Sequence, residues 1–244
     1  LGVVEINSQE GVVNDEEWMP DIFRTSNSAD VSRLEADLAR VSVALQAVKK
    51  YDTTKQPLLR TRIEMGEEAF IDYMNANKTS IELSVDQAVS ADKTITEAKT
   101  EINRLKTVIA GLEPWQNLDL PMELSETKFA CTILGTVNVK TDIARLQTSV
   151  CDAVPSVVME EVSADKQQKY LYFLCLKEEK DMLYEALRPF AFVPVTLAEN
   201  KGTVKELIAS YHNNIVELEE NIQKQEEVLT ALSSARKNIE YLYD

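Results

Sequence analysis

Residues 102–137, INRLKTVIAGLEPWQNLDLPMELSETKFACTILGTV, decide the fold that this chain can adopt. The stretch opens with apolar residues three and four positions apart, which is the pattern of an amphipathic helix. It closes with a run typical of a β-strand, and Gly111 and Pro114 between the two are the usual signals of a helix end. A narrow apolar stripe is unstable alone in water, so this helix needs a partner.

The helix that ends at Leu112 belongs to a pattern that begins at Ser80, and a short separate helix is predicted over 66–77. A second helical pattern precedes it, with apolar residues spaced alternately by three and four. That spacing is the seam of a coiled coil. The seam residues are Val31, Leu34, Leu38, Val41, Leu45 and Val48.

The same spacing returns over residues 211–243, where only Gln225 and Arg236 are polar among the seam positions. No Gly or Pro interrupts this segment. We therefore expect one continuous helix over 201–244, roughly 60 Å long at about 1.5 Å per residue. A coiled coil is the usual reason for a helix of this length.

Residues 113–200, between the two long helices, have the pattern of a small separate domain. Strand-like and helix-like segments alternate there in the order β-α-β-β-α-β, which is the ferredoxin-like arrangement. In that arrangement the first and third strands are neighbours, so Cys131 and Cys175 are expected on adjacent strands as small buried side chains. The ends of such a domain lie close together, so the helices 80–112 and 201–244 leave it side by side.

The sequence therefore predicts an α+β fold. A long antiparallel helical coiled-coil hairpin, made of residues 80–112 and 201–244, carries the ferredoxin-like lobe 113–200 at its tip. Residues 1–79 are expected to form a partial α/β proximal lobe and a helical segment, with a strand over 1–6 and a loop over 7–27.

Composition excludes several classes of function. The net charge of -15 leaves no basic footprint for nucleic acid. The few glycines form no phosphate-binding loop, and His212, the single histidine, is expected to be a solvated helical residue. The three cysteines form no CxxC pair. We expect no catalytic residue, no cofactor and no metal.

One candidate partner surface follows from the strand over residues 168–177. Tyr170, Tyr172 and Leu174 alternate along it and therefore share one face of the sheet. If the two helices of the lobe cover the other face, these residues line an open face that can bind a partner. The alternative is that this face packs on the junction with the long helices, where Trp115 is expected to be a packing residue. The sequence favours neither.

Three segments give the chain a family resemblance. LGVVEI (1–6), GLEPWQNLDLPMEL (111–124) and LGTV (134–137) resemble subunit I of the bacterial and archaeal V/A-type rotary ATPases, whose eukaryotic counterpart is subunit a. The resemblance extends over essentially the whole chain. Its most specific part is the segment around Pro114 and Trp115.

The resemblance implies a stator of an ion-translocating, hydrogen-ion-transporting complex at the cytoplasmic face of a membrane. The family's cytoplasmic half has a proximal and a distal lobe, and its other half is embedded in the membrane. This sequence is expected to be a fragment without that membrane half. The implied partners are a peripheral-stalk subunit heterodimer and other ATPase subunits, with no catalysis by this fragment.

Two other classes compete with this interpretation. A ferredoxin-like lobe can also be a small-molecule-binding regulatory module on a coiled-coil arm, although residues 138–142 lack the glycine-rich turn of most ligand-binding loops. The arm of a chromosome-type ATPase is the third class. That class needs a zinc hook or hinge at the tip and nucleotide-binding termini, and the sequence has neither.

Overall fold

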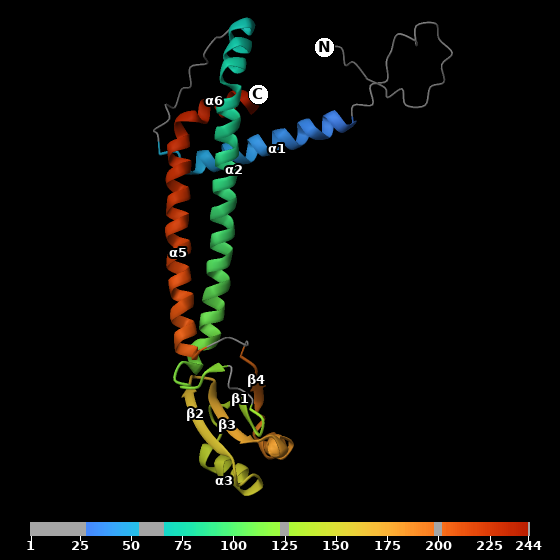
Figure 1. The fold of residues 1–244 in the computed structure, drawn as a ribbon, viewed down its shortest axis with the longest axis vertical. Helices are drawn as coiled ribbons and strands as arrows, with labels where there is room; N and C mark the ends of the chain where they lie inside the picture. The colour runs from blue at the N-terminus through green and yellow to red at the C-terminus, as the bar shows by residue number, and fades with distance from the viewer. Residues whose placement is uncertain (1–27, 54–65, 123–126, 198–201, 244) are drawn as a thin grey trace, which may run out of the picture.

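The computed structural model of the chain describes residues 28–53, 66–122, 127–197 and 202–243. Two long helices lie side by side, a small sheet domain caps one end of the pair, and a further helix crosses the other end (Figure 1). The fold is α+β, as the sequence predicted. The strand and loop that the sequence predicted within residues 1–27 lie outside the described residues.

The two long helices are α2 (Glu67–Leu112) and α5 (Val204–Ala231), which run antiparallel and together form what we call the shaft (Figure 1). α2 has 46 residues and is about 69 Å long at 1.5 Å per residue. It is one continuous helix, so the predicted break before Ser80 is wrong. No Gly or Pro lies within residues 67–79, and the first turns of α2 are held by contacts of Phe70 and Tyr73 with Tyr241.

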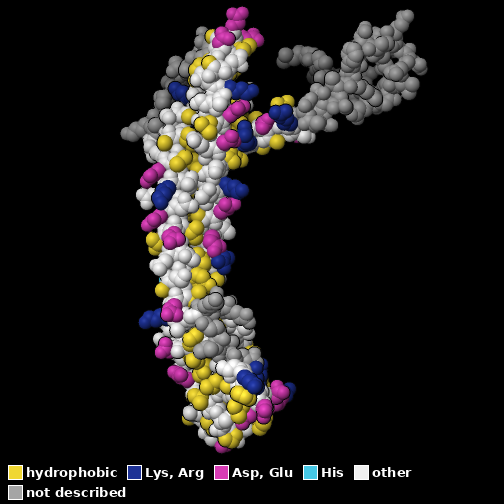
Figure 2. All heavy atoms as spheres, viewed as in Figure 1, with side chains coloured by type: hydrophobic (Ala, Val, Ile, Leu, Met, Phe, Trp, Pro, Cys, Tyr) yellow, Lys and Arg dark blue, Asp and Glu magenta, His cyan; other side chains and the backbone are white. Residues whose placement is uncertain are grey.

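The shaft is stabilised by one buried stripe along α2. Its members recur every three or four residues, as an amphipathic helix requires. They are Ile81, Val85, Ala88, Ala91, Ile95, Ala98, Ile102, Leu105, Ile109 and Leu112. Ile215 and Leu229 of α5 are buried against it. Outside the stripe, acidic and basic side chains are scattered along the shaft (Figure 2).

The return helix is interrupted near its end, so the prediction of one continuous helix over 201–244 is wrong. α5 ends at Ala231, a 3₁₀ turn η6 (Leu232–Ala235) follows, and α6 (Arg236–Tyr243) leads away from the shaft axis (Figure 1). The turn contains two adjacent serines, and the Ser234 hydroxyl donates to the Ala231 carbonyl at 3.0 Å. Serine pairs are a common site of helix kinks.

α6 is held in its new direction by polar contacts. The Arg236 guanidinium donates to an Asp52 carboxylate oxygen at 2.8 Å and to Glu240 at 3.1 Å. The Tyr73 hydroxyl donates to Asn238 at 2.8 Å. Arg236 therefore does not occupy a seam position of one continuous helix. Its charge is paired with Asp52 and Glu240 instead.

The crossing helix is α1 (Ser28–Tyr51). Its second half packs on α2 and α6, with Ala44 and Ala47 of α1 buried in one cluster with Ala88 of α2. Small side chains allow two helix backbones to approach closely. Its first half extends away from the shaft (Figure 1). We call the cluster of α1, α6 and the first half of α2 the basal cluster.

The domain at the other end, which we call the lobe, has the predicted order β-α-β-β-α-β. Its elements are β1 (Ala130–Asn138), α3 (Ile143–Ala153), β2 (Val158–Ala164), β3 (Gln168–Leu176), α4 (Lys180–Leu187) and β4 (Val193–Val195). The sheet order is β2-β3-β1-β4 and every pairing is antiparallel. The first and third strands are therefore neighbours, as the sequence predicted.

The core of the lobe lies between one face of the sheet and the helices α3 and α4. Leu146 and Val150 of α3 and Leu183 and Leu187 of α4 are buried there. Gly135 of β1 is required for this packing, because a Cβ at this position would lie 2.5 Å from the backbone oxygen of Val193 and 2.1 Å from the ring of Phe192.

Candidate functional site: the junction between shaft and lobe

The junction, which we call the neck, comprises residues 112–122 and 202–204. α2 ends here in a 3₁₀ turn, η2 (Glu113–Trp115), with Pro114 in its first turn. Trp115 is only 1% exposed. Its expected role as a packing residue is confirmed.

Trp115 fixes the lobe to the shaft by contact with the sheet. Its ring meets that of Tyr170 edge-on, at 5.3 Å between centroids and 86° between planes. The Ser163 hydroxyl of β2 donates to the Pro114 carbonyl at 2.6 Å. An apolar contact and a directional bond thus join η2 to two neighbouring strands.

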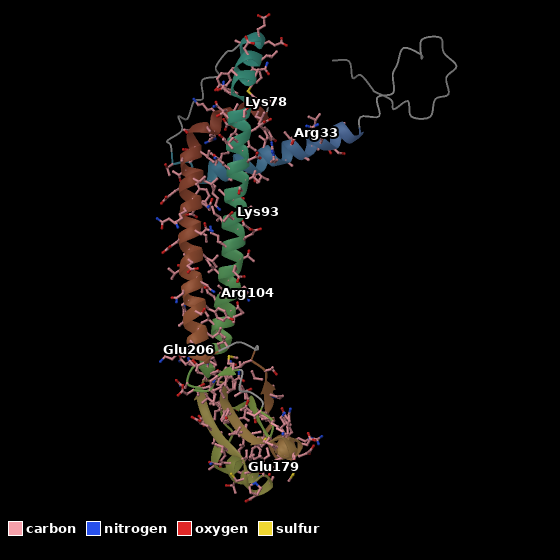
Figure 3. All side chains as sticks on the ribbon, viewed as in Figure 1. Arg33, Lys78, Lys93, Arg104, Glu179 and Glu206 are labelled. Atoms are coloured by element: carbon pink, nitrogen blue, oxygen red, sulfur yellow. The ribbon has the colours of Figure 1, made fainter. Side chains whose placement is uncertain are left out.

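The second connection is the start of α5. Thr203 caps this helix by accepting from the Glu206 backbone N–H at 3.3 Å, and the Glu206 carboxylate accepts from the Thr203 N–H at 2.9 Å. Figure 3 shows Glu206 at this junction. Gly202 just before it has φ +88, a conformation that favours glycine. Its carbonyl accepts from the Met122 N–H at 3.0 Å, so both neck segments are tied together.

The Asp165 carboxylate stabilises the turn of the β2–β3 hairpin, which packs on the neck. Asp165 accepts from the backbone N–H groups of Gln167 and Gln168 and from the Tyr170 hydroxyl. These hydrogen bonds lower the pKa of Asp165, and the two from backbone N–H groups have the largest effect. Burial and the bond to Asp165 raise the pKa of Tyr170. The charged carboxylate and the neutral phenol thus hold Tyr170 against Trp115.

The predicted partner surface lies mostly inside the neck. Tyr170 and Tyr172 are 9% and 6% exposed and belong to one apolar cluster with Trp115, while Leu174 is half-buried beside it. The alternative arrangement, in which this face packs on the junction, is the one observed. Of the two arrangements that the sequence left open, the open face does not hold for the two tyrosines, because residues 112–122 cover them.

The outer part of that sheet face remains open. Val158 of β2 is 54% exposed and lies opposite Leu174 in the strand register, and Leu176 of β3 is 45% exposed. Figure 2 shows hydrophobic side chains gathered on the lobe. The strand alternation places Leu176 on the same face as the tyrosines. The sequence could not tell how far along the strand the neck reaches, so it missed Val158 and Leu176.

The groups that carry chemistry in most enzymes do not converge here. Cys131 and Cys175 lie opposite each other on β1 and β3, with their Sγ atoms 3.7 Å apart, and both are buried free thiols, as expected. The pKa of Cys175 is raised to about 12. Burial is the largest cause, and the neighbouring Cys131 thiol is the next. His212 is an exposed helical residue, as predicted. Among the described residues, no group of three His, Cys, Asp or Glu side chains can hold a metal ion.

A pocket of about 260 Å³ adjoins the neck. It is lined by residues 118 and 120–122 of the neck, by residues 131–134 of β1 and by residues 194–197, with Tyr172, Lys180 and Tyr184. Lys180 is the one charged side chain in this lining, so the pocket favours a small ligand with apolar surface and an anionic group.

The fold and the neck define an α+β protein in which a pair of long helices carries a small sheet domain. Solved structures of 33 chains are similar to it. One is the crystal structure of the cytoplasmic N-terminal domain of subunit I, the homolog of subunit a, of V-ATPase. The TM-score is 0.58 at 13% sequence identity, and the match covers 91% of this chain and 70% of that one. The resemblance to subunit I is thereby confirmed at the level of the fold.

Comparisons by sequence add nothing to this. No family model matches the chain, and no curated protein matches it. Among the helices of the described residues, none combines the length and the hydropathy that a membrane span needs.

Proposed function

We propose that this chain is the stator part of a rotary, ion-translocating ATPase. It links a peripheral-stalk subunit heterodimer to the membrane sector at the cytoplasmic face of a membrane, and it performs no catalysis itself. In this proposal the shaft is an antiparallel coiled-coil hairpin, the lobe is ferredoxin-like, and residues 1–79 contribute to a partial proximal lobe. The structural similarity to subunit I supports the proposal.

The observation that carries the proposal is a continuous series of packed contacts that joins the basal cluster, the shaft and the lobe. α2 is unbroken over 46 residues, and its buried stripe extends from Ile81 to Leu112. At the neck, Trp115 and the Thr203 cap fix both shaft helices to the lobe. At the basal cluster, the Arg236–Asp52 ion pair joins α6 to the end of α1. Bending such a rod requires breaking packed contacts, which suits an element that resists torque.

The candidate docking surface is the open part of the lobe's sheet face, made of Val158, Leu174 and Leu176. It replaces the surface centred on Tyr170 and Tyr172. Val158 and Leu176 are exposed beyond the neck, and Leu174 is half-buried against it. Exposed apolar side chains at the far end of a long arm suit the attachment of a helical stalk. The identity of the partner comes from the resemblance to subunit I.

The test is binding of the whole chain to the purified peripheral-stalk heterodimer from the same organism, measured by calorimetry. We expect Leu176→Asp to reduce the affinity at least tenfold without changing the thermal melt, because Leu176 is 45% exposed. Met182→Asp is the matched control. Met182 is 54% exposed on α4, the helix side of the lobe, and the same charge there should leave binding unchanged. Absence of binding by the unmodified chain refutes the stator proposal.

One observation favours the alternative, a ferredoxin-like small-molecule-binding regulatory module, and that is the pocket beside Lys180. Equilibrium dialysis against amino acids and nucleotides separates the two functions. Micromolar binding that is lost in Lys180→Met supports the small-molecule-binding function, whereas absence of binding to all of them removes it.

A further inference from the structure

The seam along α1 is buried over only half its length. Val41, Leu45 and Val48 are 5%, 7% and 0% exposed, because they pack in the basal cluster. The seam continues without a break toward the N-terminus. There, however, Val31, Leu34 and Leu38 are 50%, 67% and 47% exposed.

This first half of α1 is exposed on all sides. Every residue from Val31 to Ala39 is exposed, and among the described residues the helix extends away from the shaft, with Arg33 in the projecting part (Figures 1 and 3). A short helical extension has little stability of its own in water. An apolar stripe with heptad spacing is the surface that another helix covers by placing its side chains between those of the first.

The charges beside the seam select the kind of helix. With Val31 and Leu38 at the a positions and Leu34 at d, the flanking e and g positions are Glu35 and Asp37, and both are exposed. Residues at e and g form the ion pairs that choose a coiled-coil partner. Arg33 lies one position further from the seam, at c. The exposed seam is therefore acidic along both sides.

These charges exclude two obvious occupants. A second copy of α1 would bring e and g positions against e and g positions in either orientation, so acidic side chains would face acidic side chains. The chain's net charge of -15 adds to this repulsion. Residues 1–27, which precede the helix, contain several Asp and Glu and a single basic residue, Arg24, so they do not complement the seam either.

We propose that the projecting half of α1 is a docking site for an amphipathic helix of another protein, with apolar residues at heptad spacing and Lys or Arg on both flanks. The shaft presents this site at the end opposite to the lobe. The inference is independent of the proposed function, because it rests on the seam and its charges alone.

The test uses two synthetic helical peptides of three heptads with identical Leu and Ile seams, one with Lys and one with Glu at e and g. Fluorescence anisotropy measures their binding to the whole chain. We expect the Lys peptide to bind at least tenfold more tightly than the Glu peptide. Leu34→Asp should weaken the Lys peptide at least tenfold, although it makes the chain more negative. Non-specific attraction to an acidic protein predicts the opposite change.

Charge reversal supplies the second arm. Glu35→Lys combined with Asp37→Lys should reverse the preference in favour of the Glu peptide. Asp152→Lys combined with Glu178→Lys is the matched control, because it changes the net charge equally at exposed positions of the lobe. It should preserve the preference. Equal binding of both peptides, insensitivity to Leu34→Asp, or a dimer in sedimentation that Leu34→Asp dissociates would each overturn the proposal.

Discussion

Replacement of Trp115 by Ala should weaken the whole molecule, because this side chain makes the main apolar contact between the shaft and the lobe. Trp115 is 1% exposed and packs among Leu112, Leu118 and Tyr170 in the neck. Removal of a buried Trp costs about 3–5 kcal/mol of unfolding free energy, through lost burial and the cavity that remains. The edge contact with Tyr170 is included in this figure and contributes about 0.5–1.5 kcal/mol. Because Trp115 is almost fully buried, we expect a loss near the middle of this range, about 4 kcal/mol.

The assay is urea unfolding followed by far-UV circular dichroism. Phe129→Ala is the control, since Phe129 is an aromatic residue of the lobe that is 69% exposed. It should change the free energy by no more than about 0.5 kcal/mol. A loss below about 1 kcal/mol in Trp115→Ala, or an equal loss in both variants, would refute the assignment of Trp115 as the main connection.

Four further predictions concern charges and thiols. Asp52→Ala should cost about 3 kcal/mol in urea unfolding, the low end for a broken buried ion pair, because Arg236 loses its closest partner and keeps only Glu240 at 3.1 Å; the side chains of Arg236 and Asp52 are 12% and 3% exposed. Asp52→Leu combined with Arg236→Met should recover most of that loss, and failure to do so would mean that the ion pair is not the cause. In the native protein a thiol reagent should label the exposed Cys151 rapidly, and Cys131 and Cys175 only on unfolding. Since burial raises the pKa of Cys175 from 9.0 to about 12, the stability from its neutral thiol is complete below pH 9 and lost as the pH rises toward 12. Cys175→Ala should flatten this alkaline loss, and an unchanged profile would contradict the assignment. Hydrogen bonds lower the pKa of Asp165 below 3.8, so its contribution is present above that pH and is lost as the pH falls through the lower folded-state value. In Asp165→Asn the melting temperature should therefore fall less at acid pH than in the unmodified protein. An unchanged loss at acid pH would contradict this role of Asp165.

The sequence by itself determined the order of the elements and most of the elements themselves, apart from the start of α2 and the division between α5 and α6. Periodicities of 3.6 and 2 depend on local geometry, so α2, α5 and the alternating elements of the lobe could be read from residues close in the chain. The Gly111 and Pro114 signals located the end of α2 within a residue or two. The neighbouring cysteines followed from the order of strands alone. Each of these features is encoded within one short segment or within the topology.

The tertiary structure alone decided which faces are covered. Tyr170 and Leu176 share a strand face, yet only Tyr170 is buried, because the extent of the neck depends on Trp115, which lies far from β3 in sequence. Arg236 fits a helical seam by spacing, but its charge pairs with Asp52, and the helix bends at Leu232–Ala235. The α1 seam is uniform in sequence and half-buried in space, because α2 and α6 reach only its second half. A local pattern specifies that a face is apolar, whereas only the arrangement of distant segments specifies what meets it.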